Sequence, residues 1–263
     1  LKRSAYLFVF DLDGTLLGRD KLISKRNQQA INLIHTMGDH MTIATARPPR
    51  SIQYLNEPLR GVGKIYYNGA MYALPMGNGQ YSKRVHPIQQ EVLRELLHYM
   101  MSHFPEVGIS LEVDDKWYTL SDFDFAGHFM VEDGPVRITL EEAALMACVK
   151  VLFLRCQETE GLVARFGNLC HIIVTDGGDL VQVMALEATK ESAVSHLANC
   201  LNIPYERVIC FGDDYNDMGM FRTFGTCVAM ENGVQALKDL ATHITTPHDE
   251  DGVAVFVEAF YGL

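Results

Sequence analysis

The sequence predicts an α/β protein with a Rossmann-like three-layer core, a mainly parallel sheet and an inserted α+β domain. Short apolar runs alternate with amphipathic helical patterns in the first and last thirds of the chain, as in right-handed βα crossovers. The middle third instead combines helices with alternating, hairpin-like strands. The 263 residues, 48% hydrophobic and 21% charged, suffice to bury a substantial core.

The first third predicts three strands and two helices. Ser24 is a good N-cap for the first helix, whose apolar residues recur at helical spacing, and Gly38 ends it. Asn68-Gly69 is a tight-turn signal after the third strand. In order, we expect a strand at 6–10, a helix from 25 to 37, a strand at 40–44, a helix at 50–55 and a strand at 64–67.

The pattern changes near residue 83, and we assign residues 83–186 to the inserted α+β domain. Its expected elements are a helix at 89–103, hairpin strands at 108–113 and 116–120 with a turn at 114–115, a loop at 123–135, a helix near 140, a strand at 150–154, a helix at 158–166, a strand at 171–174, a turn at 177–178 and a strand at 180–186.

The βα alternation resumes with a helix from Thr189, a plausible N-cap, through Leu201. It continues with a strand at 208–211, a helix at 215–224, a strand at 227–230, a helix at 234–240, a strand at 243–245 and a final helix from 252. Residues 1–82 and 187–263 would therefore form one core around one sheet.

Composition restricts the classes of function. The 33 acidic residues outnumber the 22 basic ones, and the formal charge of −11 disfavours nucleic-acid binding. The six cysteines show no CxxC spacing, and the ten histidines show no metal-binding spacing. No apolar run is long enough to span a bilayer, so we expect a cytoplasmic protein without a membrane partner.

Acidic residues follow two apolar runs that lie far apart in the chain. Asp11 and Asp13 follow the run at 6–10, and a denser cluster follows the run at 208–211. That cluster is Gly212-Asp213-Asp214-Tyr215-Asn216-Asp217, more than helix capping explains. If the two strands are neighbours, the acids meet at the carboxyl edge of a parallel sheet. An oxygen-only set of this kind favours Mg²⁺ over Zn²⁺.

The two acids of the first cluster suit phosphoryl chemistry. Asp11, at the end of a strand, could attack phosphorus and form an aspartyl phosphate that water then hydrolyses. Asp13 could donate a proton to the leaving oxygen and later accept one from water. A lone DxD pattern is otherwise a turn or helix-entry signal. The preceding strand and the distant acids favour the catalytic interpretation.

Two further residues suit an anionic ligand. Thr45 follows a strand and could bind a phosphate oxygen through its hydroxyl and backbone N–H, although a simple helix cap would also explain it. Lys190 stands at a helix start, where the helix dipole disfavours a cation. It could face an anionic partner, or it could be an ordinary exposed lysine.

Together these segments resemble the Cof-type phosphatases of the haloacid dehalogenase (HAD) superfamily, with the large inserted cap domain of subclass IIB. The resemblance covers the whole chain, with four motifs in order. The motifs are Asp11-Leu12-Asp13-Gly14-Thr15, Thr45, Lys190 and the cluster at 212–217. The segments Tyr67-Asn68-Gly69-Ala70 and Glu250-Asp251-Gly252-Val253-Ala254 are also similar to recurrent segments of these proteins.

The resemblance implies a role for each motif. Asp11 would be the nucleophile and Asp13 the general acid and base. Mg²⁺ would be held by Asp11, the backbone carbonyl of Asp13, and Asp213, with Asp217 close by. The phosphoryl group would be held by Thr45, Lys190 and Asn216.

Two residues depart from the family's pattern. Ala46 replaces a glycine that usually follows the threonine, which matters if that position needs a positive φ. Glu191 replaces a glycine that usually follows the lysine, and it adds a negative charge near the site. Neither change removes a catalytic group.

The function these residues favour is Mg²⁺-dependent hydrolysis of small phosphorylated metabolites, with sugar phosphates as the family's common substrates. Two alternatives are a phosphomannomutase-like phosphotransferase and a non-catalytic regulator that binds a phosphometabolite. Dehalogenation is disfavoured because Asp13 offers a general acid that such chemistry does not use. The aromatic stretch at 112–128 could read the leaving group, or it could simply pack the cap hairpin. The oligomeric state is open.

Overall fold

The computed structural model describes residues 4–75, 81–129, 133–157, 159–175 and 179–263. The chain divides into two compact units, one formed by Leu1–Arg84 with Thr189–Leu263 and the other by Val85–Ala188. Both boundaries lie two residues beyond the expected ones at 82 and 186. We call the first the core unit and the second the inserted unit.

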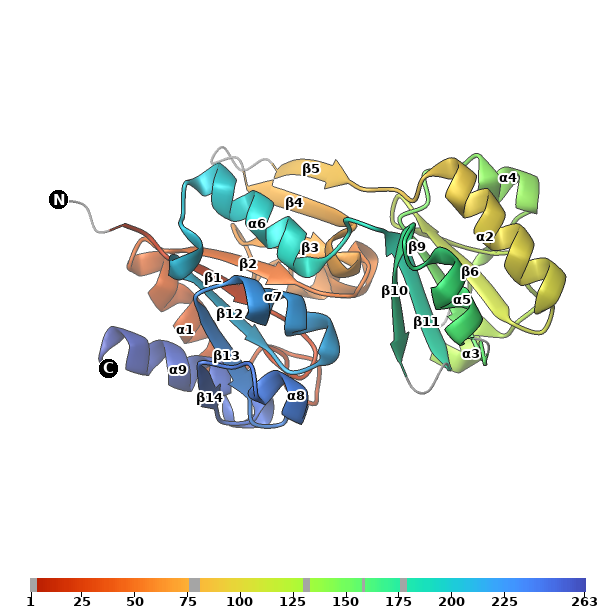
Figure 1. The fold of residues 1–263 in the computed structure, drawn as a ribbon. Coiled ribbons are helices and arrows are strands. Elements are labelled where there is room, and N and C mark those ends of the chain that lie inside the picture. The colour runs from red at the N-terminus through yellow and green to blue at the C-terminus, as the bar shows by residue number, and fades with distance from the viewer. Residues whose placement is uncertain (1–3, 76–80, 130–132, 158, 176–178) are drawn as a thin grey trace. The chain divides into compact units, whose positions relative to one another are not determined.

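The core unit contains an eight-stranded sheet with the order β14-β13-β12-β1-β2-β3-β4-β5 (Figure 1). Its strands are β1 (Leu7–Phe10), β2 (His40–Ala44), β3 (Gly63–Tyr66), β4 (Met71–Pro75), β5 (Tyr81–Val85), β12 (Val208–Gly212), β13 (Thr226–Met230) and β14 (His243–Thr245). Strands β14 through β3 pair in parallel, whereas β4 runs antiparallel to β3. The expected mainly parallel α/β fold is confirmed.

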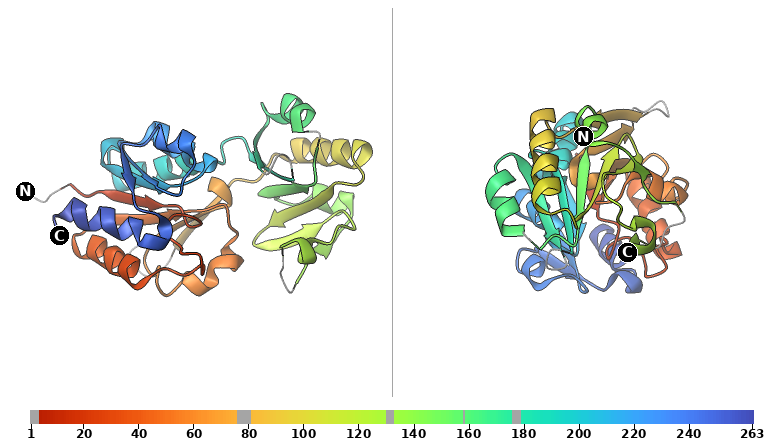
Figure 2. Two further views of the ribbon diagram at one scale, coloured as in Figure 1. Left: turned by 90° about the horizontal axis from the view of Figure 1, so that it is seen from below. Right: turned by 90° about the vertical axis from the view of Figure 1, so that its right-hand side faces the viewer.

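Strand β1 is apolar on both faces because helices cover both faces of the sheet (Figure 2). Leu7 and Val9 belong to the cluster packed on one face by α6 (Lys190–Leu201), α7 (Met218–Thr223) and α8 (Gln235–Lys238). The alternate residue Phe8 meets Phe260 of α9 (Gly252–Tyr261), with ring centroids 5.6 Å apart. Helix α1 (Lys25–Thr36) contacts α9 and completes the third layer.

Register brings the two acidic segments together. Strand β1 lies between β2 and β12, and Phe10 pairs with Phe211. The next residue, Asp11, donates its backbone N–H to the Phe211 carbonyl at 3.2 Å. Because parallel strands end at the same edge, the loops after Phe10 and after Gly212 emerge side by side.

The inserted unit contains a six-stranded sheet with the order β10-β11-β9-β6-β7-β8, mostly antiparallel. Its strands are β6 (Gly108–Val113), β7 (Lys116–Thr119), β8 (Val136–Arg137), β9 (Lys150–Leu154), β10 (Cys170–Thr175) and β11 (Leu180–Ala185), and its helices are α2 (Gln90–His103), α3 (Phe125–Phe129), α4 (Leu140–Ala144) and α5 (Thr159–Phe166). Alternate residues such as Ile109, Val151 and Val181 form a second hydrophobic core with α2 and α5. This antiparallel sheet with helices packed on one face is the expected α+β arrangement.

Several local expectations differ from the structure. The expected loop at 123–135 contains α3, because Phe125 is buried and its ring packs against Trp117 and Phe123. Tyr67 is not the end of a strand but begins the single turn η2 (Tyr67–Gly69). Strands β4 and β5 were not expected, and β5 shows no apolar alternation because its five residues are exposed at the sheet edge.

Two expected helices are irregular. The helix expected at 50–55 is a 3-10 helix, η1 (Pro49–Leu55), and the one expected at 215–224 is divided into η5 (Tyr215–Asp217) and α7. The turn expected at 177–178 lies outside the described residues. No helix within the described ranges is long and apolar enough to cross a membrane.

Candidate active site

Three carboxylates meet where β1 and β12 end. Asp11, Asp213 and Asp217 each offer one oxygen, and these oxygens lie within 4.8 Å of one another. Asp11 follows β1, Asp213 lies in the loop after β12, and Asp217 is the last residue of η5. Like charges at this separation repel unless a cation lies among them. The donor set consists of oxygen alone, which fits a hard divalent cation such as Mg²⁺.

Lys190 supplies one positive charge to this cluster. Its Nζ lies 2.6 Å from Asp11 Oδ1 and 2.8 Å from Asp217 Oδ1, and its side chain is fully buried. The alternative of an ordinary exposed lysine is therefore wrong. Burial opposes its charge, but Asp11 and Asp217 outweigh that effect and raise the pKa of Lys190. The side chain is held as a cation at the first position of α6.

Asp217 anchors the loop after β12. Its carboxylate is inaccessible to solvent, and Oδ1 accepts from Lys190. Its Oδ2 accepts from the backbone N–H groups of Asp213 at 3.1 Å and Asp214 at 3.3 Å. Both oxygens are thus engaged within the protein, and the loop that carries Asp213 is fixed. Burial and the charge of Asp217 raise the pKa of Asp213 to about 6.

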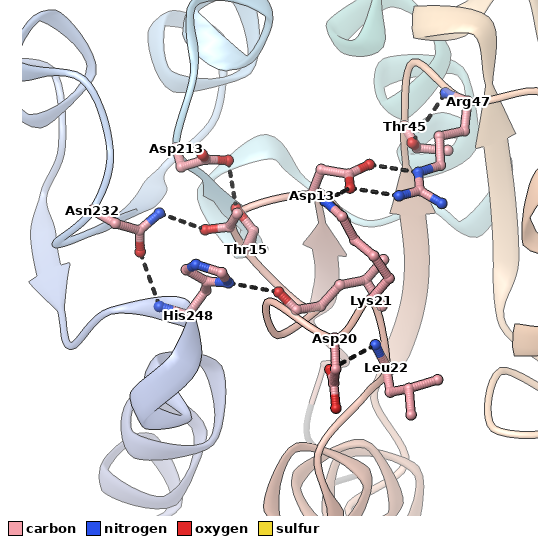
Figure 3. A network of polar contacts seen from close by, with 12 residues as sticks. Asp13, Thr15, Asp20, Lys21, Leu22, Thr45, Arg47, Asp213, Asn232 and His248 are labelled. Atoms are coloured by element: carbon pink, nitrogen blue, oxygen red, sulfur yellow. Dashed lines mark hydrogen bonds and ion pairs between the residues drawn. The ribbon is translucent and has the colours of Figure 1, made fainter. Parts of the chain in front are cut away.

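Gly14 allows the loop after β1 to approach Asp213. Its φ of +78° favours glycine, and a Cβ built there would lie 2.1 Å from Asp213 Oδ2. The neighbouring Thr15 donates its hydroxyl to Asp213 Oδ1 at 3.0 Å. The Gly14 carbonyl accepts from Asn232 Nδ2 at 2.8 Å, and Asn232 Oδ1 accepts from the His248 backbone N–H at 2.9 Å (Figure 3). This contact with the last third of the chain was not expected.

Asp13 lies apart from the three-carboxylate cluster. Arg47 holds its carboxylate through two contacts, Nε to Oδ2 and Nη2 to Oδ1, both 2.6 Å, and Lys21 Nζ lies 2.8 Å from Oδ1 (Figure 3). Burial would raise the pKa of Asp13, but the hydrogen bonds from Arg47 and Lys21 outweigh it and lower that pKa. This pairing was not expected from the sequence, in which its signal was the place of Arg47 directly after Thr45-Ala46.

Thr45 and Asn216 lie on two further loops of the same unit. Thr45 is buried, its N–H donates to the Ile65 carbonyl at 2.9 Å, and its hydroxyl accepts from the Arg47 N–H at 3.1 Å. The next helix begins only at Pro49, so the alternative of a simple helix cap is wrong. Asn216 Nδ2 donates to Asn68 Oδ1 at 3.2 Å.

The two departures from the family's pattern are accommodated. Ala46 is not among the described residues with a positive φ, so alanine causes no backbone strain there. The Glu191 carboxylate packs against α7, because a Cβ built at Gly219 would lie 2.2 Å from Glu191 Oε2.

In the inserted unit, the aromatic stretch packs internally, with Trp117 edge-on to Phe125 and Phe129. This packing supports the structural interpretation of the stretch at 112–128.

Comparison with known proteins agrees with this architecture. The family described as haloacid dehalogenase-like hydrolase matches residues 8–257. A 5-amino-6-(5-phospho-D-ribitylamino)uracil phosphatase of Bacillus subtilis, YitU, is 27% identical, and the alignment covers 100% of both chains. The crystal structure of TM0651 from Thermotoga maritima is 26% identical with a TM-score of 0.82 and covers 97% of each chain. The HAD subclass IIB sugar phosphatase BT4131 has a TM-score of 0.83 at 22% identity, covering 98% of this chain and 99% of that one.

The chain belongs to the haloacid dehalogenase-like hydrolases. The predicted family and the prediction of an enzyme are therefore confirmed, and its curated relatives include named phosphatases.

Proposed function

We propose that this protein hydrolyses phosphate monoesters of small metabolites through an aspartyl phosphate on Asp11, with Mg²⁺ as cofactor. The observation that carries the proposal is the position of Asp11, directly after strand β1. One of its carboxylate oxygens lies within 4.8 Å of an oxygen of Asp213 and of Asp217, and the buried Lys190 ammonium contacts it. A carboxylate placed among a cation and metal-binding oxygens is suited to attack an anionic phosphoryl group, since the surrounding charges offset the repulsion.

Asp11, the backbone carbonyl of Asp13, and Asp213 would hold Mg²⁺, with Asp217 next to them. When bound, the ion neutralises the carboxylates and polarises a phosphoryl oxygen. Lys190, Thr45 and Asn216 would bind the phosphoryl oxygens. The fixed positions of these groups support this assignment, because phosphoryl transfer depends mainly on positioning and charge stabilisation.

The reaction has two steps. In the first, an Asp11 oxygen forms a bond to phosphorus, the ester bond breaks, and the leaving oxygen takes a proton from Asp13. In the second, Asp13 takes a proton from water as the water attacks phosphorus, which releases inorganic phosphate and restores Asp11. Arg47 and Lys21 favour the ionised form of Asp13, which suits the second step. The first step therefore requires Asp13 to be loosened from these partners.

The substrate proposed is a small phosphorylated sugar or sugar alcohol. The name of YitU denotes activity on a phosphoribityl compound, and BT4131 is named as a sugar phosphatase. We propose that the inserted unit acts as the cap that excludes water and contacts the leaving group. The overall negative charge supports a role for the local cations, since an anionic substrate must approach a chain of formal charge −11.

The test is a screen of the wild-type protein with Mg²⁺ against sugar phosphates, sugar alcohol phosphates, nucleotides and a generic aryl phosphate, with release of inorganic phosphate as the readout. Asp11→Asn should abolish hydrolysis while leaving the fold intact, whereas Asp239→Asn, at the end of α8, should retain it. Appreciable hydrolysis by Asp11→Asn would exclude the covalent mechanism. Transfer to a second sugar in place of water, dependent on a bisphosphate, would identify a phosphotransferase instead.

A further inference from the structure

The turn at the end of β3 is unusual in its backbone and lies beside the proposed phosphate-binding residues. Tyr67, Asn68 and Gly69 all have positive φ, at 51°, 54° and 108°. Asn68 donates its backbone N–H to the Thr45 carbonyl at 2.9 Å. Gly69 packs against the residue before Lys190, since a Cβ built there would lie 2.1 Å from the Thr189 carbonyl oxygen. This turn therefore contacts the segments that carry Thr45 and Lys190, two of the residues proposed to bind the phosphoryl group.

The side chain of Asn68 contacts Asn216, the third residue proposed to bind the phosphoryl group. Its Oδ1 accepts from Asn216 Nδ2 at 3.2 Å. Asn68 thus joins the Thr45 loop through its backbone and the Asn216 loop through its amide. Its side chain lies where these loops meet.

The other half of the amide is unsatisfied. Asn68 is only 1% exposed, and its Nδ2 has no hydrogen-bond partner among the described residues. Two further buried side-chain atoms in this condition, on Ser110 and Gln182, lie in the inserted unit. A buried donor without an acceptor is unfavourable, so its retention needs a cause.

The backbone conformation at position 68 does not explain why an asparagine stands there. Asparagine tolerates the left-handed region, but glycine tolerates it better and carries no amide. Burial does not exclude a ligand from this place either. Thr45 and Lys190 are each 1% exposed as well, and both are proposed to bind the same phosphoryl group.

We propose that Asn68 Nδ2 donates a hydrogen bond to an oxygen of the bound phosphoryl group, which makes Asn68 a further substrate-binding residue beside Thr45, Asn216 and Lys190. The inference rests on the proposed function of this site. The amide then has both halves paired when the ligand is present: Oδ1 with Asn216 and Nδ2 with the phosphoryl oxygen.

Two substitutions test the Nδ2 donor of Asn68 separately from its backbone conformation and its Oδ1 acceptor. Asn68→Gly keeps the left-handed backbone and removes the amide. Asn68→Asp keeps an Oδ1 acceptor for Asn216 but replaces the donor with a second oxygen. The matched control is Asn202→Gly, at the left-handed C-cap of α6 (φ 53°), which changes the same residue type in the same backbone conformation.

The measurements are kcat and KM for the best substrate of the screen, the inhibition constant of inorganic phosphate, and the melting temperature, all with Mg²⁺. A hydrogen bond to a charged oxygen is worth about ten- to hundredfold in affinity. We expect Asn68→Gly to weaken phosphate inhibition and kcat/KM by that factor, with Asn68→Asp at least as impaired and Asn202→Gly at wild-type values. Wild-type kinetics for Asn68→Gly would overturn the proposal. Recovery in Asn68→Asp would overturn it too, because the residue would then serve only to position Asn216.

A phosphate-binding measurement tests the role of Asn68 even if the protein hydrolyses no ester. If the wild-type protein hydrolyses no ester, the proposed function fails, but titration calorimetry with inorganic phosphate and Mg²⁺ still compares wild type with Asn68→Gly. Equal affinities in that comparison would overturn the role of Asn68. A wild-type protein that binds no phosphate would overturn it as well.

Discussion

Lys190 and Asp11 form a buried ion pair of 2.6 Å across 179 positions of the chain. The pair joins the start of α6 to the end of the central strand, and the second contact of Lys190, to Asp217, adds the loop after β12. One ammonium group thus contacts residues from two other segments of the candidate active site. Its removal should therefore affect stability and activity together.

We expect Lys190→Met to abolish activity and to lower the free energy of unfolding by about 3–5 kcal/mol, since it leaves buried carboxylates without their cation. Urea denaturation without Mg²⁺ measures the second effect. Lys25→Met, at the exposed first position of α1, is the control and should change little. The double variant Lys190→Met with Asp217→Asn should recover part of the lost stability. If it recovers none, charge burial is not the cause.

Gly14→Ala should impair metal binding in addition to straining the backbone. Gly14 and Gly38 share a φ of +78°, but a Cβ at Gly14 meets Asp213 at 2.1 Å and one at Gly38 meets nothing within 4 Å. Both alanine variants should lose about 1–2 kcal/mol of stability from the left-handed backbone. Only Gly14→Ala should need more Mg²⁺ for half-maximal activity. An equal Mg²⁺ requirement in the two variants would contradict this account of Gly14.

Arg47→Met should raise the pKa of Asp13, because Arg47 supplies the strongest influence that lowers it. A lowered folded-state pKa contributes stability above the unfolded value and loses that contribution as the pH falls through the folded value. The stability lost in Arg47→Met should therefore be larger at neutral pH than at about pH 3, which lies below the ordinary carboxyl pKa of 3.8. Urea denaturation at both pH values, with Arg60→Met as the exposed control, measures the difference. A loss independent of pH would show that Arg47 stabilises by packing alone.

Only one cysteine should react in the native protein. Cys200 is exposed, whereas Cys148, Cys156, Cys170, Cys210 and Cys227 are buried. Burial raises the pKa of Cys148 to about 12 and that of Cys170 and Cys227 to about 11, so these thiols carry little thiolate at neutral pH. Mass spectrometry after iodoacetamide treatment should show one label in buffer and six in urea. Rapid labelling of Cys210 in buffer would indicate that the core sheet opens locally.

The sequence predicted most of the elements and the meeting of Asp11 with Asp213, because both depend on apolar runs whose ends are marked by acidic residues. The contacts of Asp13 with Arg47 and Lys21 were not predictable in this way. Pairing between side chains of separate loops leaves no periodic signal. The burial of Lys190 was equally hidden, since a helix start is usually exposed. Strand β5 was missed because an exposed edge strand lacks the alternation that identifies a half-buried one.

The order of strands has a consequence for biosynthesis. Strand β1 leaves the ribosome well before its neighbour β12, which ends only at Gly212, after the whole inserted unit. Until then the edge of β1 that pairs with β12 has no partner strand, and the carboxylates of Asp213 and Asp217 have not yet been added to the chain. The inserted unit has its own sheet and core, so it can fold before the core unit is complete. A chain that ends between Ala188 and Val208 would therefore contain the whole inserted unit but lack the strand that pairs with one edge of β1.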